Sequence, residues 1–155
     1  MFNSTTPVWK QEFDSSEPAL SEHKAAPELI AAFSQKAVKV ACDHDEILFE
    51  KGEPARSVYL VTTGEVGLMM PVSASRAMGF RAEPGSLVGL PAAFSNEPYS
   101  MTAMAWKGAE LRVMSRERFC DMIAANPALS LDVLRILAAE TRAARIAIAE
   151  SGIKP

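Results

Sequence analysis

Cysteine and histidine, on which many catalytic and metal sites depend, are scarce in this sequence. Its 155 residues include two of each, Cys42 and Cys120, and His23 and His44. The cysteines lack the paired spacing of a metal site, so we expect buried free thiols without a disulfide. Neither histidine accompanies a nucleophile motif, and there is no P-loop or dinucleotide fingerprint. We therefore predict that the protein is not an enzyme.

One acidic turn, Asp43–Glu46, surrounds His44 with carboxylates. A metal site needs ligand atoms that converge on one point, and neighbours within a turn rarely do so. We therefore interpret this turn as a solvated acidic surface and predict no metal site in the protein.

A strong charge of one sign and long apolar runs are also missing. The 16 basic and 19 acidic residues give a net charge of -3, without the basic footprint typical of direct nucleic-acid binding. No stretch approaches the roughly 20 apolar residues of a membrane span, and the N-terminus has no signal-peptide core. We expect a soluble, cytoplasmic protein with no nucleic-acid or membrane partner. A length of 155 residues and a hydrophobic content of 48% suffice for one domain with its own core.

The composition changes along the chain. Residues 1–26 are polar and are expected to form an arm, partly disordered, that Trp9 and Phe13 could anchor. Pro27 opens a short helix, since proline suits a first helical turn. Beyond it, short β-rich runs separated by Gly, Pro and Asn predict a sandwich or jelly roll. The expected strands are Val38–Val40, Ile47–Glu50, Val58–Thr62, Val66–Pro71, Ala77–Ala82, Leu87–Val88, Tyr99–Trp106 and Glu110–Met114.

The C-terminal part has helical periodicity. Ser115 is an expected N-cap, Asn126-Pro127 ends the first helix, and a long helix follows within residues 127–150. One face of this helix has the 3-4 spacing of a coiled-coil seam. Val133, Ile136 and Ile146 lie off that seam and are expected to pack on the β-rich part. A helix that is apolar on two sides predicts a homodimer, although packing on its own domain alone is the simpler alternative. The seam residues are Leu134, Leu137, Thr141, Ala144 and Ile148.

The segment Ile47–Met70, ILFEKGEPARSVYLVTTGEVGLMM, is the most informative in the chain. Two short strands flank a turn that contains Gly52, and a second turn contains Gly64. Each glycine stands where a tight turn needs a positive φ. With the order of elements over residues 27–149, this pattern resembles the cyclic-nucleotide-binding domain family. That family includes regulatory domains of cyclic-nucleotide-dependent kinases, cyclic-nucleotide-gated channels, and the catabolite-activator and fumarate/nitrate-regulator transcription factors.

The resemblance implies a fold of the α+β class, mainly β, for residues 27–150. It is a double-stranded β-helix, or jelly roll, with a short N-terminal helix and a long C-terminal helix for dimerisation. Bacterial regulators of this type also carry a helix-turn-helix DNA-binding domain. Because the sequence ends at Pro155, we expect this chain to be a sensor-like module without one.

The resemblance also implies a ligand cassette with the pattern F-G-E-L-A-L, a turn, and P-R-(A/S)-A-T. In the family, the Arg pairs with the cyclic phosphate, the Glu accepts from the ribose hydroxyl, and backbone N–H groups cradle the phosphate. Here Val88–Thr102 reads VGLPAAFSNEPYSMT, with Leu90 in place of the Glu and Tyr99 in place of the Arg. Pro91 removes one N–H from the helix start. The residues that keep the pattern are Gly89, Pro98, Ser100 and Thr102.

The two replacements predict altered or lost affinity for cyclic nucleotides. Losing two hydrogen bonds to charged groups costs about 3–6 kcal/mol, or two to four decades of affinity. Three interpretations stay open: a less charged ligand in an apolar cavity with Phe94 and Met101, a site filled by its own side chains, or weak cyclic-nucleotide binding. The candidate ligand-binding residues are Gly89, Leu90, Ala92, Tyr99, Ser100, Thr102 and Thr141.

The leading functional hypothesis is a regulatory, ligand-sensing module that acts as a homodimer. Its ligand would be a cyclic nucleotide or another small molecule, and no other cofactor is expected. Its output would be a change in the dimer or in an unidentified protein partner. The alternatives are a ligand-free dimerisation or scaffold protein, and a genuine but weak cAMP- or cGMP-binding protein.

Overall fold

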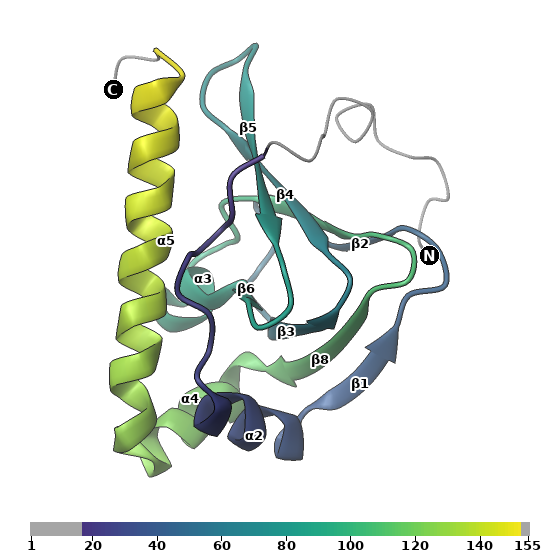
Figure 1. The fold of residues 1–155 in the computed structure, drawn as a ribbon, viewed down its shortest axis with the longest axis vertical. Helices are drawn as coiled ribbons and strands as arrows, with labels where there is room; N and C mark the ends of the chain where they lie inside the picture. Colours follow the sequence, from purple (N-terminus) through teal and green to yellow (C-terminus); the bar gives the residue numbers. More distant parts are fainter. Residues whose placement is uncertain (1–16, 153–155) are drawn as a thin grey trace.

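The computed structural model describes residues 17–152. Most of the predicted N-terminal arm, with Trp9 and Phe13, lies outside these residues. The described end of that arm packs on the domain: Leu20 is 3% exposed, and its N–H donates to the Arg81 carbonyl at 2.8 Å. The Ala26 N–H, in turn, donates to Asp132 Oδ2 at 2.8 Å. Residues 17–26 therefore connect the β-rich part with the C-terminal helix (Figure 1).

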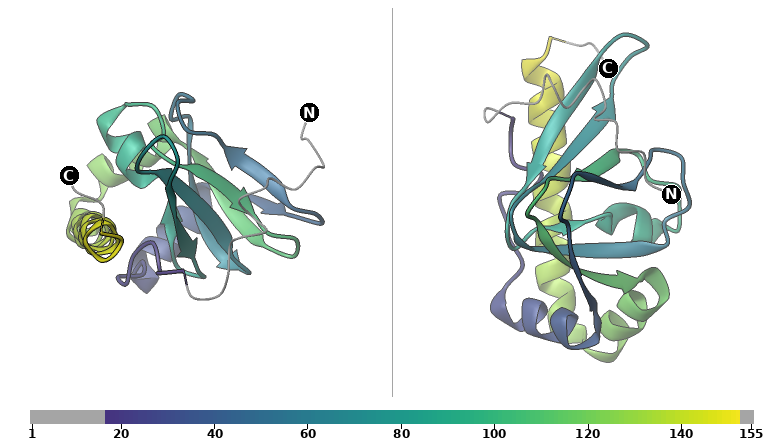
Figure 2. Two further views of the ribbon diagram at one scale, coloured as in Figure 1. Left: turned by 90° about the horizontal axis from the view of Figure 1, so that it is seen from above. Right: turned by 90° about the vertical axis from the view of Figure 1, so that its right-hand side faces the viewer.

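The β-rich part consists of two four-stranded antiparallel sheets, which confirms the predicted jelly roll. The two sheets face each other and close into a roll (Figure 2). One sheet has the order β1 (Val38–Ala41), β8 (Glu110–Ser115), β3 (Ser57–Thr63) and β6 (Leu87–Val88). The other has the order β2 (Glu46–Phe49), β7 (Thr102–Ala105), β4 (Val66–Pro71) and β5 (Ala77–Ala82).

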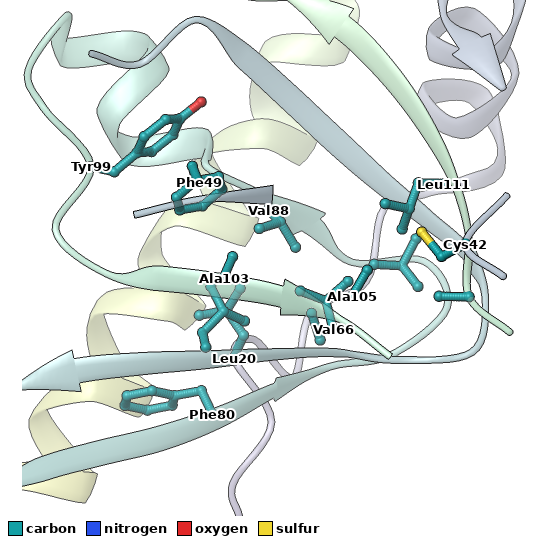
Figure 3. Close-up of a cluster of buried hydrophobic side chains, with 14 of the residues drawn as sticks. Leu20, Cys42, Phe49, Val66, Phe80, Val88, Tyr99, Ala103, Ala105 and Leu111 are labelled. Carbon is teal, nitrogen blue, oxygen red and sulfur yellow. The ribbon is translucent and has the colours of Figure 1, made fainter. Parts of the chain in front are cut away.

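A first buried cluster fills the inside of the roll. Val66 and Leu68, two positions apart on β4, point inward as the alternation of a strand requires, and both are at most 2% exposed. They meet Phe80 of β5 and the small side chains Ala103 and Ala105 of β7 (Figure 3). Small residues on this strand leave room for the larger ones, so the interior is filled without a wide channel.

A second buried cluster covers the outer face of the sheet that contains β3. It is built by α2 (Pro27–Lys36), α3 (Leu90–Ser95), α4 (Arg116–Ala125) and α5 (Ser130–Glu150), the last preceded by the 3-10 turn η1 (Pro127–Leu129). Phe33 and Phe119 join α2 to α4, with ring centroids 6.0 Å apart. Because this sheet is covered on both faces, the consecutive residues Leu60 and Val61 of β3 are both buried.

Several element boundaries were predictable and others were not. Ser115 is the N-cap of α4, as predicted, and its hydroxyl accepts from the Arg118 N–H at 3.2 Å. The strand expected over Tyr99–Trp106 begins only at Thr102. Ile146, expected to pack on the roll, is 45% exposed, whereas Val133 and Ile136 are buried as expected. Val133 and Ile136 lie on the face of α5 that packs on the domain, whereas Ile146 lies on a more exposed face.

Within residues 17–152, no single helix has the length and the apolar character needed to cross a bilayer. Only α4 taken together with η1 and α5 meets those requirements, and the pair is bent by 105°.

Replacing Gly67 with alanine is expected to lower the free energy of unfolding by about 1–3 kcal/mol, because the added methyl group would overpack against the Trp106 ring. Gly67 lies on β4, and a Cβ there would overlap Cζ2 of the Trp106 ring. Urea denaturation of Gly67→Ala, Trp106→Ala and the double variant measures the effect. The double variant should be more stable than the two separate losses predict. Equal stability of Gly67→Ala and the parent would contradict this packing.

Candidate ligand-binding site

The cassette Val88–Thr102 forms a short helix and a returning loop beside α5. Gly89 precedes α3 with φ +85°, a left-handed conformation that glycine adopts without steric cost. A Cβ there would lie 3.0 Å from the Tyr99 ring and 3.2 Å from the Ser57 carbonyl oxygen. The helix ends after six residues at Asn96, whose φ is +55°. The chain then returns through Tyr99 to β7.

Tyr99, which the sequence pattern aligns with the family arginine, is 4% exposed. Its ring stacks on Phe49 with centroids 3.7 Å apart and planes 12° apart (Figure 3). Its hydroxyl donates to the Ser57 carbonyl at 2.7 Å and accepts from the Ser57 N–H at 3.1 Å. Burial raises the pKa of this phenol, so Tyr99 is a neutral, fully bonded side chain.

The backbone also holds Tyr99 in place. Its N–H donates to the Glu53 carbonyl at 3.0 Å, and its carbonyl accepts from the Gly52 N–H at 2.8 Å. These bonds tie the cassette to the turn between β2 and β3. Tyr99 therefore helps to close this end of the roll.

The remaining cavity at the cassette has a volume of about 40 Å³. Sites for drug-sized ligands occupy about 300–1,000 Å³, while one water takes about 30 Å³ in the liquid. In this conformation the cavity accepts a group of one or two non-hydrogen atoms and not a nucleotide. Its lining residues are Phe49, Leu68, Gly89, Pro91, Ala92, Tyr99, Ser100, Met101 and Glu140.

Glu140 of α5 contributes the charge of the cavity. The residue keeps part of its surface exposed, but its Oε2 is buried and has no hydrogen-bond partner in the described part of the chain. Burial raises the pKa of this carboxyl to about 8, since ionisation in an apolar site is unfavourable. A phosphate at this place would meet a second acid instead of a counter-ion.

Four of the predicted site residues come together at this cavity: Gly89, Ala92, Tyr99 and Ser100. Met101, expected in an apolar pocket, also lines it. These residues form one wall of the cavity, and their contact with a ligand stays a prediction. None of Arg76, Arg81, Lys107 and Arg112, the cations nearest in sequence, contributes to the lining.

The structure does not bring the other predicted residues to the cavity. Leu90 is fully buried in the helical cluster, and Phe94 packs edge-on against Phe119 there, with ring centroids 5.6 Å apart. The Thr102 hydroxyl accepts from the Lys51 N–H at 3.1 Å. Thr141 is exposed, and its hydroxyl donates to the Leu137 carbonyl within α5 at 3.0 Å. Contact of these residues with a ligand stays a prediction that would need a rearrangement.

The sequence interpretation missed Glu140 in favour of its neighbour Thr141. The helical spacing could have identified Glu140, because positions 133, 136, 140 and 147 lie on one face of the helix. Val133, Ile136 and Ala147 are all buried. A glutamate on that face points toward the roll, while Thr141 is turned about 100° away.

The geometry of the acidic turn Asp43–Glu46 differs from what the sequence predicted. The ligand atoms of Asp43, His44 and Glu46 lie within 4.8 Å of one another, although sequence neighbours were not expected to converge. His44 Nδ1 is 2.6 Å from Asp43 Oδ1, and its Nε2 is 3.5 Å from Glu46 Oε1. The side chains of His44 and Asp43 are 57% and 90% exposed, so polar contacts within an exposed acidic turn account for the geometry.

Comparison with solved structures identifies the same fold in bacterial regulators. The catabolite activator protein of Thermus thermophilus has a TM-score of 0.69 and 22% identity, over 84% of this chain and 62% of that one. The c-di-GMP-responsive global regulator CLP of Xanthomonas campestris has a TM-score of 0.61 and 21% identity, over 82% and 61%. A mutant of a cAMP-binding acyltransferase from Mycobacterium smegmatis has a TM-score of 0.57 and 22% identity, over 72% and 34%.

This chain therefore spans about three fifths of the Thermus protein, and at these identities the likeness shows the fold alone. No curated protein sequence matches this chain significantly. A family model described as the cyclic nucleotide-binding domain matches residues 39–126, which is more than half of the chain. The match runs from β1 to the end of α4 and includes the whole cassette. The chain belongs to the cyclic nucleotide-binding domain family.

Proposed function

We propose that this regulatory domain is a sensor module whose cassette has lost high affinity for cAMP and cGMP. One observation carries the proposal: Tyr99, stacked on Phe49 and bonded twice to Ser57, occupies the arginine position and leaves a cavity of about 40 Å³. A cyclic nucleotide would have to displace this ring and break its bonds before binding. It would then lack both charged contacts of the family pattern.

The cost of these changes can be approximated from two terms. The missing contacts amount to about 3–6 kcal/mol, and releasing the Tyr99 hydroxyl from Ser57 adds about 1–3 kcal/mol. Each 1.4 kcal/mol weakens binding tenfold. A micromolar site of the family type would therefore bind in the millimolar range or more weakly.

Calorimetric titration of the purified protein with cAMP and cGMP tests the proposal. We expect no binding tighter than about 1 mM for either nucleotide, because anion-pairing groups are missing and the site is filled. Micromolar binding of either one would overturn the proposal, since it would require a cassette that opens and pairs the phosphate at low cost. Millimolar binding would agree with it.

Dimerisation through α5 is part of the same proposal. Leu131 and Leu134 are 55% and 60% exposed on this helix, and Ile146 is 45% exposed. Large apolar side chains left exposed along one helix favour burial against a second copy. Sedimentation equilibrium of the same sample should give the mass of two chains.

Glu140 connects the cavity directly with α5, the proposed dimerisation helix. It is the lining residue that α5 contributes, so a change in cavity occupancy acts on the helix that we propose as the interface. A guest in the cavity can shift α5 from one position to another only if it binds more tightly when the helix is in the second position. A ligand-free scaffold is the second candidate function, and the small cavity favours it. The absence of enzymatic activity also stays a prediction, since the same fold occurs in a cAMP-binding acyltransferase.

A further inference from the structure

The cavity at the cassette has the charge of a cation site. Its ionisable lining residues, among those that the structure describes, are Tyr99 and Glu140. The Tyr99 hydroxyl is already bonded to Ser57, whereas Glu140 Oε2 is buried without a partner. A buried acceptor without a donor is unfavourable, and a guest that supplies the donor would relieve this cost.

We propose that this cavity binds the primary ammonium head of a small organic cation, with the Glu140 carboxylate as its counter-ion. The inference deepens the proposed function: it rests on the cassette still being a ligand site, and it replaces an anionic ligand by a cationic one. Three properties of the site support it: size, charge and lining.

The size of the site suits such a head. A cavity of about 40 Å³ holds one or two non-hydrogen atoms, which matches an ammonium nitrogen and its first carbon. Any longer part of the ligand would extend past the exposed Ser100 and Pro91 at the rim. A bulkier quaternary ammonium would not enter and would bring no N–H donor.

The lining also favours a positive charge over a negative one. Phe49 and Tyr99 line the cavity together, and neither ring brings a positive charge that would repel a cation. A buried charge needs a partner of opposite sign, and Glu140 can provide one only for a cation. An anion would be opposed by the same carboxylate.

Proton balance gives the proposal a distinctive signature. Burial keeps the Glu140 carboxyl neutral up to about pH 8, because this is where its raised pKa lies. When the ammonium head binds, the carboxyl ionises to pair with it, and its proton passes to the buffer. The site therefore exchanges one proton for one cation. Its affinity for the cation rises with pH up to about 8, whereas an anion would bind more weakly as the pH rises.

Methylammonium chloride is the probe, and the methyl group of Met101 is the reporter because this residue lines the cavity. The protein is labelled with 13C-methyl methionine and titrated at constant ionic strength with potassium chloride. We expect saturation of the Met101 shift at millimolar methylammonium, about twentyfold tighter near pH 8.5 than near pH 6.5. The other methionine methyl groups should not saturate. Tetramethylammonium, which has no N–H donor, should leave the Met101 signal unchanged.

Two variants identify the counter-ion. Glu140→Gln should abolish saturation, while Glu97→Gln, which removes an exposed carboxylate of the cassette loop, should leave it unchanged. The methionine spectrum also reports whether each variant is folded. The pH series of the parent protein tests the proposal even if a variant does not fold. Saturation that is independent of pH or of Glu140, equal binding of tetramethylammonium, or no saturation up to about 100 mM would each overturn the proposal. These results would not change the outcome of the nucleotide titration, so each proposal can be contradicted independently of the other.

Discussion

The free energy of unfolding of the parent is expected to fall by about 4 kcal/mol between about pH 5 and pH 8, and replacing Glu140 with glutamine should abolish this fall. Burial raises the pKa of this carboxyl from 4.5 to about 8. Over this interval the unfolded chain releases a proton that the folded chain retains. The folded state binds more protons, so its stability falls as the pH rises, by about 1.4 kcal/mol per unit. The loss begins above the unfolded pKa and levels off above the folded one.

Urea denaturation of the parent and of Glu140→Gln at four pH values, at equal protein concentration, measures this effect. Other groups titrate in both proteins, so the difference between the two curves isolates Glu140. The glutamine also buries a polar group, which shifts the whole curve without a pH dependence. Glu97→Gln is the matched control and should keep the slope of the parent. Parallel curves for the parent and Glu140→Gln would contradict a buried neutral carboxyl.

Replacing Tyr99 with alanine is expected to lower the free energy of unfolding by about 3–5 kcal/mol, as is typical when a large buried side chain is removed. The change deletes the ring stacked on Phe49 and leaves the Ser57 N–H and carbonyl without their partner. Tyr99→Phe keeps the ring and loses only the hydroxyl bonds, so it should cost about 1–3 kcal/mol. The gap between the two variants measures how much the ring itself closes the site.

Thermal and urea denaturation measure both losses, and phenol tests the shape of the opened site. A ligand that binds only the folded state raises its stability, so about 10 mM phenol should raise the melting temperature of Tyr99→Ala. The parent, whose remaining cavity of about 40 Å³ is too small for phenol, should not respond. A loss below about 1 kcal/mol for Tyr99→Ala, or an equal response of the parent to phenol, would show that Tyr99 does not close the cassette.

These two residues carry the proposed change in the family site. Tyr99 and Glu140 both line the cavity, and Glu140 Oε2 is buried there without a hydrogen-bond partner in the described part of the chain. Under the proposed function, the Tyr99 ring opposes a bound phosphate sterically, and the Glu140 carboxyl opposes it electrostatically. The fold of the family is retained, and the proposal assigns a different chemistry to its cassette.

Local rules made much of the fold predictable from the sequence. Gly52 and Gly64 adopt φ values of +93° and +75°, as their turns required, and Ser115 caps α4. These features depend on a few neighbouring residues, because backbone sterics and capping act over one turn. The same holds for the cassette, where Gly89 was correctly placed at the start of α3. The family, the order of the elements and four lining residues of the cassette cavity therefore follow from the sequence alone.

Only the tertiary structure decided what the cassette can hold. Whether Tyr99 lies across the site or swings away depends on Phe49 and Ser57, which are distant in sequence. Whether Glu140 or Thr141 faces the cavity depends on the rotation of α5, and one residue along a helix turns a side chain by about 100°. That rotation is fixed by packing over the whole length of the helix. The charge and volume of the site are therefore properties of the packed molecule, since each arises from side chains that only folding brings together.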